Sequence, residues 1–402
     1  MNCNDFIRQY GLAPDTIDGP KCLSLLLEQM ELGLAGQGNI PMIPSYLTLD
    51  SQPQVGKPCC VLDAGGTNLR VAKAEFQADG SCTISDLRRF PMPGTQGVLS
   101  AKEFYETLAD HVRNTGCTQQ IGLCFSYNVL QERTLDGILM GWCKEVRVPD
   151  APGKPVGASL RNAIGAECDS VRVLNDSTAA LLGAHSLNPE ITLGLILGTG
   201  INICYCEPCA RIQKVPRDLN AERMIISTEI GEFDGFPKSP FDAAVIASSD
   251  EPELAHSEKQ CAGAYLGQII SLAWQEAAHL GLLSEGFQTS RDLPTISNYL
   301  AGDYRDLPQD AAAMEIAQTV IHRAAKIAAV LTAGPILRSC PAGASCTLVI
   351  EGSQYHRLTG FGPAFRQELE ELLAPHNIVF SLAQVENSCL LGAAMAAFAQ
   401  PM

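Results

Sequence analysis

Two stretches with the same order of residue types, far apart in the chain, constrain its fold more than any other feature. Residues 61–71 and residues 193–205 each contain an apolar run, a glycine-containing turn and a second apolar run. This order predicts two β-hairpins. The turns at Gly65-Gly66 and Gly198-Thr199-Gly200 lack bulky side chains, so their backbone N–H groups can approach an anion closely. The repetition predicts an internally duplicated α/β protein that holds a phosphate between its halves.

The first hairpin also carries polar side chains suited to a nucleotide phosphate. Thr67 and Asn68 supply neutral hydrogen-bond donors, and Arg70 supplies a cation. Asp63 is a suitable ligand for hydrated Mg²⁺. An ordinary structural hairpin with a buried aspartate is the alternative interpretation of this stretch. The chain has no G-x-x-x-x-G-K-[ST] loop and neither hairpin has the G-x-G-x-x-G turn, so P-loop and dinucleotide-binding folds are not expected.

Composition limits the class of protein and its partners. A chain of 402 residues, with 46% hydrophobic and 18% charged residues, is long enough for two domains with separate cores. Its net charge of −16 argues against nucleic acid or an anionic membrane as the main partner. Because residues 1–11 show no signal peptide, the 16 cysteines are expected to be free thiols in a reducing cytoplasm. The longest run of apolar residues and glycine, at 389–399, is too short to span a bilayer.

Strands and helices alternate along the rest of the chain. The strands expected at residues 121–126 and 171–174 place Ser126 and Asp176 at C-terminal strand ends, as Asp63 is placed by the first hairpin. Because ligands in open α/β sheets lie beyond these ends, the three residues are candidate site residues. Helices are expected at residues 22–34, 102–112, 159–166, 258–274, 311–337 (with a break near Gly334-Pro335), 363–373 and 388–398.

Asp176 allows two interpretations. It lies in Asn175-Asp176-Ser177-Thr178, directly after the strand at 171–174 and at the start of a helix. A side chain there commonly caps the helix. The functional interpretation is a general base next to a hydroxyl nucleophile.

Taken together, these motifs resemble the hexokinase family, within the actin-like ATPase superfamily, over nearly the whole chain. Residues 62–70 and 197–202 resemble the two phosphate motifs of the family, and residues 174–177 resemble the segment with the catalytic base. The remaining segments resemble the sugar-binding and adenosine-side motifs: 125–127, 142–144, 228–231, 258–259, 351–355, and Asn387-Ser388 with Gly392. Each motif is weak alone, whereas their order and spacing are specific.

The resemblance implies an α/β, two-lobed actin-like ATPase (ribonuclease H-like) fold, in which duplicated α/β domains surround a cleft. Each lobe is expected to contain a five-stranded sheet. The small lobe is expected at residues 58–180, with 385–402 returning to it. The large lobe is expected to combine residues 1–57 and 181–384.

The resemblance also implies an activity, the Mg²⁺-dependent transfer of the ATP γ-phosphate to the 6-hydroxyl of glucose or a related hexose in cytoplasmic glycolysis. Asp176 would be the general base, with Lys144 as a second catalytic residue. Asp63 would bind Mg²⁺ through water. The sugar would contact Ser126, Lys144, Asn175, Asp176, Asn202, Glu229 and Glu258. The nucleotide would contact Asp63, Gly65, Gly66, Thr67, Asn68, Arg70, Thr199, Gly352, Ser353 and Ser388.

The sequence departs from the family pattern at sugar-binding positions. Cys143 replaces a threonine, Tyr127-Asn128 replaces Phe-Pro, and Ile230 replaces a tryptophan. The segment after Asn387 also lacks the usual Gly-Ser-Gly-Lys. The acceptor therefore stays open, and mannose, fructose or an amino sugar are alternatives to glucose. A non-catalytic sugar sensor on the same fold is a further alternative, against which the two aspartates argue. The oligomeric state is not predicted.

Overall fold

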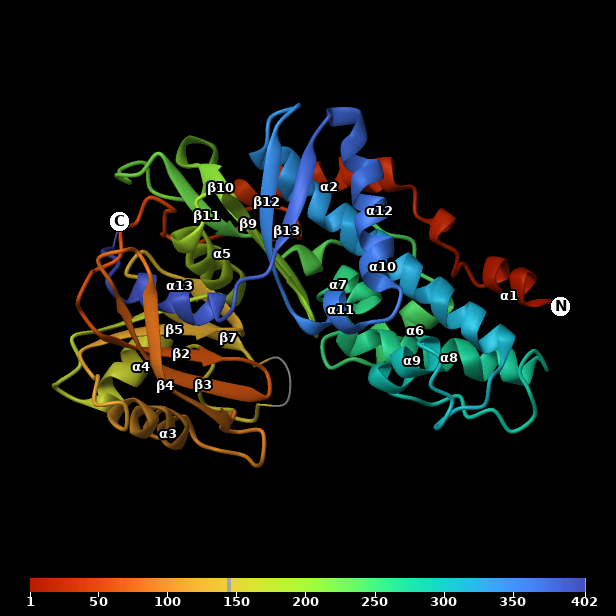
Figure 1. Cartoon of the computed structure of the whole chain (residues 1–402), viewed down its shortest axis with the longest axis horizontal. Helices are drawn as coiled ribbons and strands as arrows, with labels where there is room; N and C mark the ends of the chain where they lie inside the picture. Colours follow the sequence, from red (N-terminus) through yellow and green to blue (C-terminus); the bar gives the residue numbers. More distant parts are fainter. Residues whose placement is uncertain (143–145, 402) are drawn as a thin grey trace.

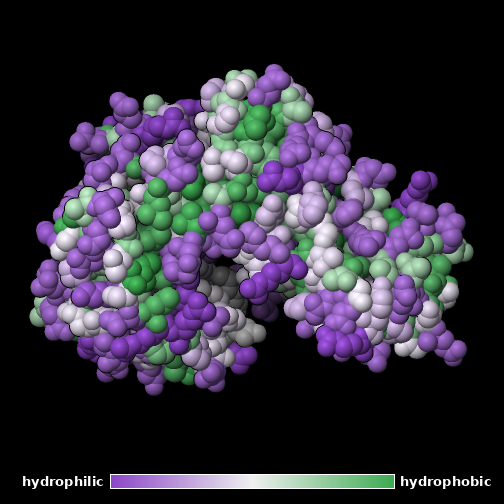
Figure 2. Space-filling model, in the orientation of Figure 1, coloured by the Kyte–Doolittle hydropathy of each residue, from purple (hydrophilic) through white to green (hydrophobic). Residues whose placement is uncertain are grey.

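The computed structural model describes residues 1–142 and 146–401. Two β-sheets, each with its own helices, form two lobes that Figure 1 shows side by side. Viewed as a space-filling surface, the molecule is hollowed between the lobes, and much of the visible rim is hydrophilic (Figure 2). The predicted α/β class is therefore confirmed.

The first lobe contains a five-stranded sheet with the order β4-β3-β2-β5-β8. Strands β2 and β3 form the predicted antiparallel hairpin, and β5 pairs in parallel with both β2 and β8. The carboxyl ends of β2, β5 and β8 therefore meet at one edge of the sheet. The strands are β2 (Cys59–Ala64), β3 (Asn68–Phe76), β4 (Cys82–Pro91), β5 (Gln120–Phe125) and β8 (Ser170–Leu174).

The second lobe contains a six-stranded sheet with the order β1-β11-β10-β9-β12-β13, so the expectation of five strands is wrong by one. The additional strand is β1, because a short proline-containing segment pairs antiparallel with β11 at the sheet edge. The strands are β1 (Ile43–Pro44), β9 (Ile191–Leu197), β10 (Ile201–Pro208), β11 (Arg223–Ser227), β12 (Ser345–Glu351) and β13 (Val379–Ala383). A separate hairpin joins β6 (Asn128–Gln131) and β7 (Gly137–Gly141).

Most of the predicted helices are present, with ends shifted by a few residues. The α-helices are α1 (Cys3–Gln9), α2 (Gly19–Leu34), α3 (Ala101–Arg113), α4 (Val156–Ile164), α5 (Asp176–Leu187), α6 (Pro240–Ser248), α7 (His256–Cys261), α8 (Gly263–His279), α9 (Leu293–Leu300), α10 (Ala311–Ser339), α11 (Ser353–Arg357), α12 (Phe361–Leu373) and α13 (Ser388–Ala397). Short 3-10 turns lie at η1 (Pro14–Thr16), η2 (Cys209–Arg211), η3 (Ile230–Glu232) and η4 (Ala374–His376).

The helix expected at residues 258–274 is in fact two helices, α7 and α8. They are separated at Ala262, which has extended backbone (φ −85°, ψ 154°). The reason is tertiary: the N–H of Gly263 donates to the carbonyl of Gly198 at 2.8 Å, and the N–H of Ala264 donates to Thr199 at 3.3 Å. The first N–H groups of α8 therefore bind the second glycine turn, which a continuous helix could not do.

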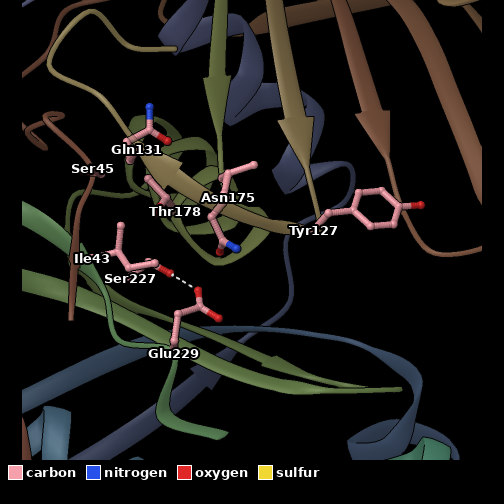
Figure 3. A pocket seen from close by; sticks show the side chains of 9 residues that line it. Ile43, Ser45, Tyr127, Gln131, Asn175, Thr178, Ser227 and Glu229 are labelled. Carbon is pink, nitrogen blue, oxygen red and sulfur yellow. Dashed lines mark hydrogen bonds between the residues drawn. The ribbon is translucent and has the colours of Figure 1, made fainter. Parts of the chain in front are cut away.

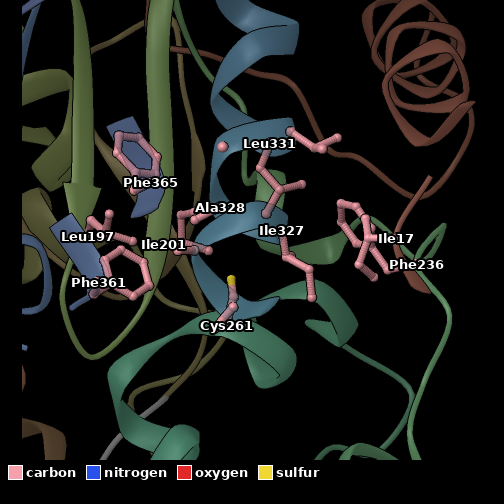
Figure 4. Packing of buried hydrophobic residues seen from close by; sticks show 14 of the residues in the cluster. Ile17, Leu197, Ile201, Phe236, Cys261, Ile327, Ala328, Leu331, Phe361 and Phe365 are labelled. Carbon is pink, nitrogen blue, oxygen red and sulfur yellow. The ribbon is translucent and has the colours of Figure 1, made fainter. Parts of the chain in front are cut away.

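Helix α10 continues through Pro335 to Ser339, so the break expected near Gly334-Pro335 does not occur. Packing stabilises this segment, because a Cβ on Gly334 would lie only 2.8 Å from the side chain of Leu26 in α2. By length and composition α10 could cross a membrane, yet 83% of its most apolar window is buried inside the protein. Figure 4 shows side chains of α10 packed between the β9–β10 hairpin and the N-terminal part of the lobe: Ile327, Ala328 and Leu331, next to Leu197, Ile201, Ile17 and Phe236.

Helices α5 and α13 join the two lobes. Helix α13 packs on β2, β5 and β8, whereas α5 packs on β9 and β10, and the two helices pack against each other (Figure 1). Their crossing is close: a Cβ on Gly392 would lie 1.9 Å from the carbonyl oxygen of Ala179. A single buried cluster therefore contains Val61 and Leu174 of one sheet together with Ile191 and Val349 of the other.

Candidate functional site

The first glycine turn lies between β2 and β3. The N–H of Gly65 donates to the carbonyl of Asn68 at 3.0 Å and closes the turn. The N–H of Met92 donates to Thr67 at 2.9 Å, and the Tyr127 hydroxyl donates to the Gly65 carbonyl at 2.6 Å. The turn is thus held by neighbouring elements as well as by its own hydrogen bond.

Asp63 and Arg70 form an ion pair below this turn, because they are register partners in the β2–β3 hairpin. Nε and Nη2 of Arg70 lie 2.7 and 2.5 Å from Oδ2 of Asp63. Nη1 of Arg70 donates to Oδ1 of Asn387, at the start of α13, at 3.2 Å. Burial alone would lower the pKa of Arg70, but the Asp63 carboxylate outweighs burial and raises this pKa. The guanidinium therefore stays charged and attaches the turn to α13.

A cavity of about 320 Å³ opens on this turn and is lined almost entirely by residues that the sequence assigned to the nucleotide. Its lining is Asp63, Gly65, Gly66, Thr67, Asn68, Arg70 and Arg89. Arg89 was not predicted. It lies on β4 as the register partner of Arg70, so it adds a second cation to the cavity. Only the strand register could have identified Arg89, because the basic residues of the chain are otherwise scattered.

The second glycine turn is held from two sides. The start of α8 donates to its carbonyl groups, as described above. On the other side lies Gly352, at the start of α11, where φ is +108° and a Cβ would meet the Leu197 carbonyl at 2.3 Å. Only glycine fits this position. Its close approach to the turn brings Gly352 and Ser353 beside Gly198, which precedes the exposed Thr199.

Asn202 is the centre of a hydrogen-bond network just beyond this turn. Its Nδ2 donates to Oε1 of Glu229 at 2.6 Å and to Oγ of Ser227 at 3.0 Å. Its Oδ1 accepts the N–H of Glu229 at 3.0 Å. Glu229 has a left-handed backbone (φ +53°), an unfavourable conformation for this residue type that the Asn202 contacts stabilise. A fourth contact, 3.4 Å from Nδ2 to Oδ1 of Asn175, connects the network to α5.

The environment of Glu229 alters its ionisation. Burial raises the pKa of the Glu229 carboxyl to about 7, and the carboxylates of Asp176 and Glu258 act in the same direction. Hydrogen bonds from Ser227 and Asn202 oppose the rise without cancelling it. Two neighbouring carboxylates thus add to the effect of burial on Glu229.

Glu258 connects this region to the second turn. Its Oε2 accepts the N–H of Ile201 at 3.0 Å. A Cβ on Gly200 would lie 2.5 Å from the same oxygen, so the glycine leaves room for the carboxylate. A Cβ on Gly231 would lie 2.9 Å from the Cβ of Glu258, which explains the glycine after Glu229 and Ile230.

Asp176 is the first residue of α5, and Asn175 is its N-cap. Oδ1 of Asn175 accepts the N–H of Ser177 at 2.9 Å and the Ser177 hydroxyl at 2.8 Å. Capping is therefore done by Asn175, while Oδ1 of Asp176 accepts the adjacent N–H of Ser177 at 2.8 Å. Since Asn175 bonds to Asn202, the half-buried Asp176 lies next to the Asn202–Glu229 network.

A narrow cavity lies between the two lobes at this point (Figure 3). Figure 3 shows the Glu229 carboxylate and Asn175 facing each other across it, with Ser227 bonded to Glu229 at 2.9 Å. Its lining combines both lobes: Ile43, Ser45, Ser227 and Glu229 with Tyr127, Val129, Gln131, Asn175 and Thr178. Its polar lining groups offer both hydrogen-bond donors and acceptors.

The remaining residues singled out in the sequence are placed as follows. Ser126 follows β5, and its N–H donates to the Ala64 carbonyl at 3.1 Å, next to the first turn. Ser388 is fully buried at the start of α13, where its hydroxyl donates to Glu351. Lys144 and Cys143 lie outside the described residues. The sequence missed Ser227, whose role depends on a fold contact between β11 and α5: its hydroxyl lies 3.3 Å from that of Ser177.

Comparison with family models identifies the same family over almost the entire chain. One model described as hexokinase matches residues 3–186, and a second one described as hexokinase matches residues 192–300 and 290–399. Among characterised relatives, hexokinase-1 of Schizosaccharomyces pombe is 31% identical over 287 residues, which cover 66% of this chain and 58% of that protein. The chloroplastic hexokinase-2 of Nicotiana tabacum is 29% identical over 345 residues, or 74% of this chain and 69% of that protein.

Solved structures share the fold. The hexokinase from Schistosoma mansoni, complexed with glucose, superposes with a TM-score of 0.84 at 22% identity, over 99% of this chain and 100% of that one. The ROK hexokinase from Thermus thermophilus gives a TM-score of 0.57 at 18% identity, over 85% and 98% of the two chains. The predicted two-lobed actin-like ATPase fold is therefore confirmed.

Proposed function

Because this chain belongs to the hexokinase family, we propose that it transfers the γ-phosphoryl group of ATP to the 6-hydroxyl of glucose or a closely related hexose. The observation that carries this proposal is the network in which Asn202 holds Glu229 and connects it to Asn175, one residue before Asp176. This network supports the proposal, because its hydrogen-bond donors and acceptors suit sugar hydroxyls and lie next to the Asp176 carboxylate. The S. pombe relative is matched over only 58% of its length, so the activity is inferred from the site as well.

The sugar would bind in and around the narrow cavity between the lobes. Its hydroxyl groups each donate and accept one hydrogen bond, and the carboxylate of Glu229 and the amide of Asn175 meet both needs. Glu258 would accept a further hydroxyl while it keeps its contact to the N–H of Ile201. Ser126 contributes from the opposite lobe, and Lys144 and Asn202 complete the proposed set.

Asp176 would accept the proton of the 6-hydroxyl as the bond from oxygen to phosphorus forms. Its place in the first turn of α5 supports this role, because the helix dipole favours a negative charge there. The Ser177 N–H fixes the orientation of the carboxylate by its bond to Oδ1. The β–γ bond of ATP breaks and ADP leaves with the electron pair. Positioning and charge neutralisation provide the remaining catalysis.

The phosphates of ATP would lie in the cavity on the first glycine turn, next to Gly65 and against the N–H of Gly66 and the side chains of Thr67 and Asn68. Thr199 would contribute from the second turn. Gly352, Ser353 and Ser388 would lie nearer the nucleoside. The net charge of the chain is −16, so Arg70 and Arg89 matter locally for anion binding.

The residues present fit a magnesium ion at Asp63. Both Arg70 contacts reach Oδ2, and within residues 1–142 and 146–401 no hydrogen bond reaches Oδ1. A carboxylate oxygen that faces a polar cavity suits Mg²⁺, which keeps most of its water. When bound, the ion would neutralise charge on the ATP phosphates. We further propose a cytoplasmic protein whose main partners are ATP and a hexose, with neither nucleic acid nor membrane as a partner.

The substitution Asp176→Ala tests the proposed reaction. Loss of general base catalysis is expected to lower sugar-dependent turnover roughly 100- to 10,000-fold. Glucose is still expected to bind, because Asn202 and Glu229 are unchanged. The shift in melting temperature on addition of glucose measures this binding. Unaltered turnover in this variant would exclude Asp176 as the base.

A further inference from the structure

Tyr127 joins the loop proposed to bind the sugar to the turn proposed to bind phosphate. Its hydroxyl donates to the carbonyl oxygen of Gly65 at 2.6 Å. We propose that Tyr127 is a positioning residue that orients the Gly65–Gly66 peptide for the phosphates of ATP. This inference rests on the proposed function, since it assigns a task within that site.

Peptide geometry connects this hydrogen bond to the phosphate cavity. No peptide bond among the described residues is cis, so the C=O of Gly65 and the N–H of Gly66 lie in one plane and point in opposite directions. A carbonyl held by Tyr127 therefore directs the Gly66 N–H away from Tyr127. Gly66 lines the cavity on the first turn, whereas Tyr127 lines the separate cavity between the lobes. The hydroxyl thus approaches one side of the peptide, and the anion would approach the other.

The Gly65–Gly66 peptide needs such an anchor. Glycine lacks a Cβ, so a peptide between two glycines can rotate with little steric cost. In rotated orientations the Gly66 N–H would no longer point into the cavity. A donor on the carbonyl favours one orientation before the nucleotide arrives and so lowers the cost of binding.

The ring of Tyr127 is itself fixed. The side chain is only 3% exposed, its ring lies 4.8 Å from that of Phe125, and Trp142 packs on it edge-on at 5.0 Å. Figure 3 shows the hydroxyl directed away from Glu229 and Asn175. The hydroxyl therefore acts on the phosphate turn, although the backbone of Tyr127 lies beside the proposed sugar site. Phenylalanine, which the family segment has here, lacks this donor.

The test is the substitution Tyr127→Phe, which removes one oxygen and keeps the ring in its packing. We expect the KM for ATP to rise about 2- to 10-fold, the effect of losing one neutral hydrogen bond. The KM for the sugar should stay unchanged, since the hydroxyl does not face the sugar. Tyr105→Phe is the matched control: Tyr105 is buried in the same core on α3 and lines neither cavity.

A second readout separates this inference from the proposed function. Calorimetric titration with ATP and Mg²⁺, without sugar, does not depend on turnover. Weaker ATP binding by Tyr127→Phe than by the wild type and Tyr105→Phe would support the positioning role. Equal ATP affinities, or an effect on the sugar KM alone, would overturn it. Wild-type protein that binds ATP but turns over no sugar would contradict only the proposed function, whereas absence of ATP binding would contradict both.

Discussion

At the scale of single residues, amides and hydroxyls position the acidic groups of the site. The side chain of Asn202 holds Glu229 at two points: Nδ2 donates to the Glu229 carboxylate, and Oδ1 accepts the Glu229 N–H. Ser227 contacts both residues. Removing one of these partners would leave a buried polar group unsatisfied, which costs about 1–3 kcal/mol. The ionisation of Glu229 follows from the same environment.

Sugar affinity is expected to depend on pH through Glu229. Its pKa of about 7, raised first by burial and then by Asp176 and Glu258, makes the group part-protonated at neutral pH. A carboxylate accepts sugar hydroxyls more strongly than a carboxylic acid does, so affinity should weaken as the pH falls from 8 to 6. Calorimetric titration with glucose across this range measures the effect. The variant Glu229→Gln should bind more weakly with a flatter profile, and an equally steep profile would assign the dependence to another group.

Glu229 should also make folding stability depend on pH, but here the protonated form of the carboxyl group is the favourable one. Between the ordinary pKa of 4.5 and about 7, the folded protein holds a proton on Glu229 that the unfolded chain has lost. The contribution of this group to the free energy of unfolding is therefore full below pH 4.5 and is lost as the pH rises through 7. The melting temperature of Glu229→Gln minus that of the wild type should therefore be more positive at pH 8 than at pH 5. A difference that is the same at both pH values would contradict this account.

Arg89 is expected to bind the nucleotide phosphates. The substitution Arg89→Ala removes one of the two cations of the cavity and should raise the KM for ATP several-fold, about the effect of one charged hydrogen bond, without changing the sugar KM. Arg88→Ala is the control, because successive side chains of a strand point to opposite faces and Arg88 does not line the cavity. If both variants raise the KM for ATP equally, the effect comes from the overall positive charge of β4, and a specific contact between Arg89 and the phosphates is excluded.

At the scale of elements, glycines set the distances at which helices and turns meet. Gly392 lets α13 approach the backbone of α5, and Gly122 lets β5 approach Ala393 of α13, where a Cβ would meet the carbonyl oxygen at 1.9 Å in each case. Because α5 begins at Asp176 and α13 begins near the Arg70–Asn387 contact, these approaches also set the relation between the proposed base and the phosphate turn.

The substitution Gly392→Ala is expected to separate α5 from α13. A methyl group there meets backbone, which cannot rotate away, so a loss of about 1–3 kcal/mol or more in the free energy of unfolding is expected. Chemical denaturation measures this loss. Gly97→Ala serves as the control, because Gly97 has open space around its Cα and an ordinary φ. Comparable stability of the two variants would mean that the helix crossing is not tightly packed.

Local sequence predicted those elements whose structure is locally determined. The hairpin of β2 and β3 follows from apolar runs on either side of Gly65-Gly66, α12 follows from its amphipathic pattern, and α13 follows from its composition, rich in alanine and glycine. The break between α7 and α8 could not be predicted, because it arises from bonds between Gly263 and the distant turn at Gly198. The continuation of α10 through Pro335 likewise depends on packing against α2.

The same distinction applies to the candidate site. Asp63, Ser126 and Asp176 could be identified because each lies at or just beyond the C-terminal end of a recognisable strand. Arg89 required the register of β4, and the role of the Tyr127 hydroxyl required the position of the Gly65 carbonyl. Residue type indicated which groups could act, and tertiary contacts determined which of them meet.

At the scale of the whole molecule, two lobes share one buried cluster and enclose a narrow cavity. Proposed sugar contacts come from both sides: Ser126 follows a strand of the five-stranded sheet, whereas Glu229 and Glu258 belong to the other lobe. A sugar that bonds to both would draw the lobes together around α5 and α13. Closure would exclude water, which competes with the sugar as phosphoryl acceptor.

Small-angle scattering tests this closure. Saturating D-glucose is expected to decrease the radius of gyration, and L-glucose, which has the same composition and the wrong stereochemistry, should leave it unchanged. The decrease should be retained in Asp176→Ala, because the base is not required for binding through Asn202 and Glu229. Identical scattering with and without D-glucose, at concentrations that raise the melting temperature, would show that binding does not close the lobes.

The most direct test of the central claim is release of ADP from ATP and Mg²⁺ in the presence of glucose, mannose, fructose and an amino sugar. We predict that at least one hexose, with glucose foremost, causes ADP release that is absent without sugar. The preferred sugar would then identify the acceptor. If no sugar causes release while glucose still raises the melting temperature, the protein is a sugar sensor on this fold, and the proposed phosphoryl transfer is wrong.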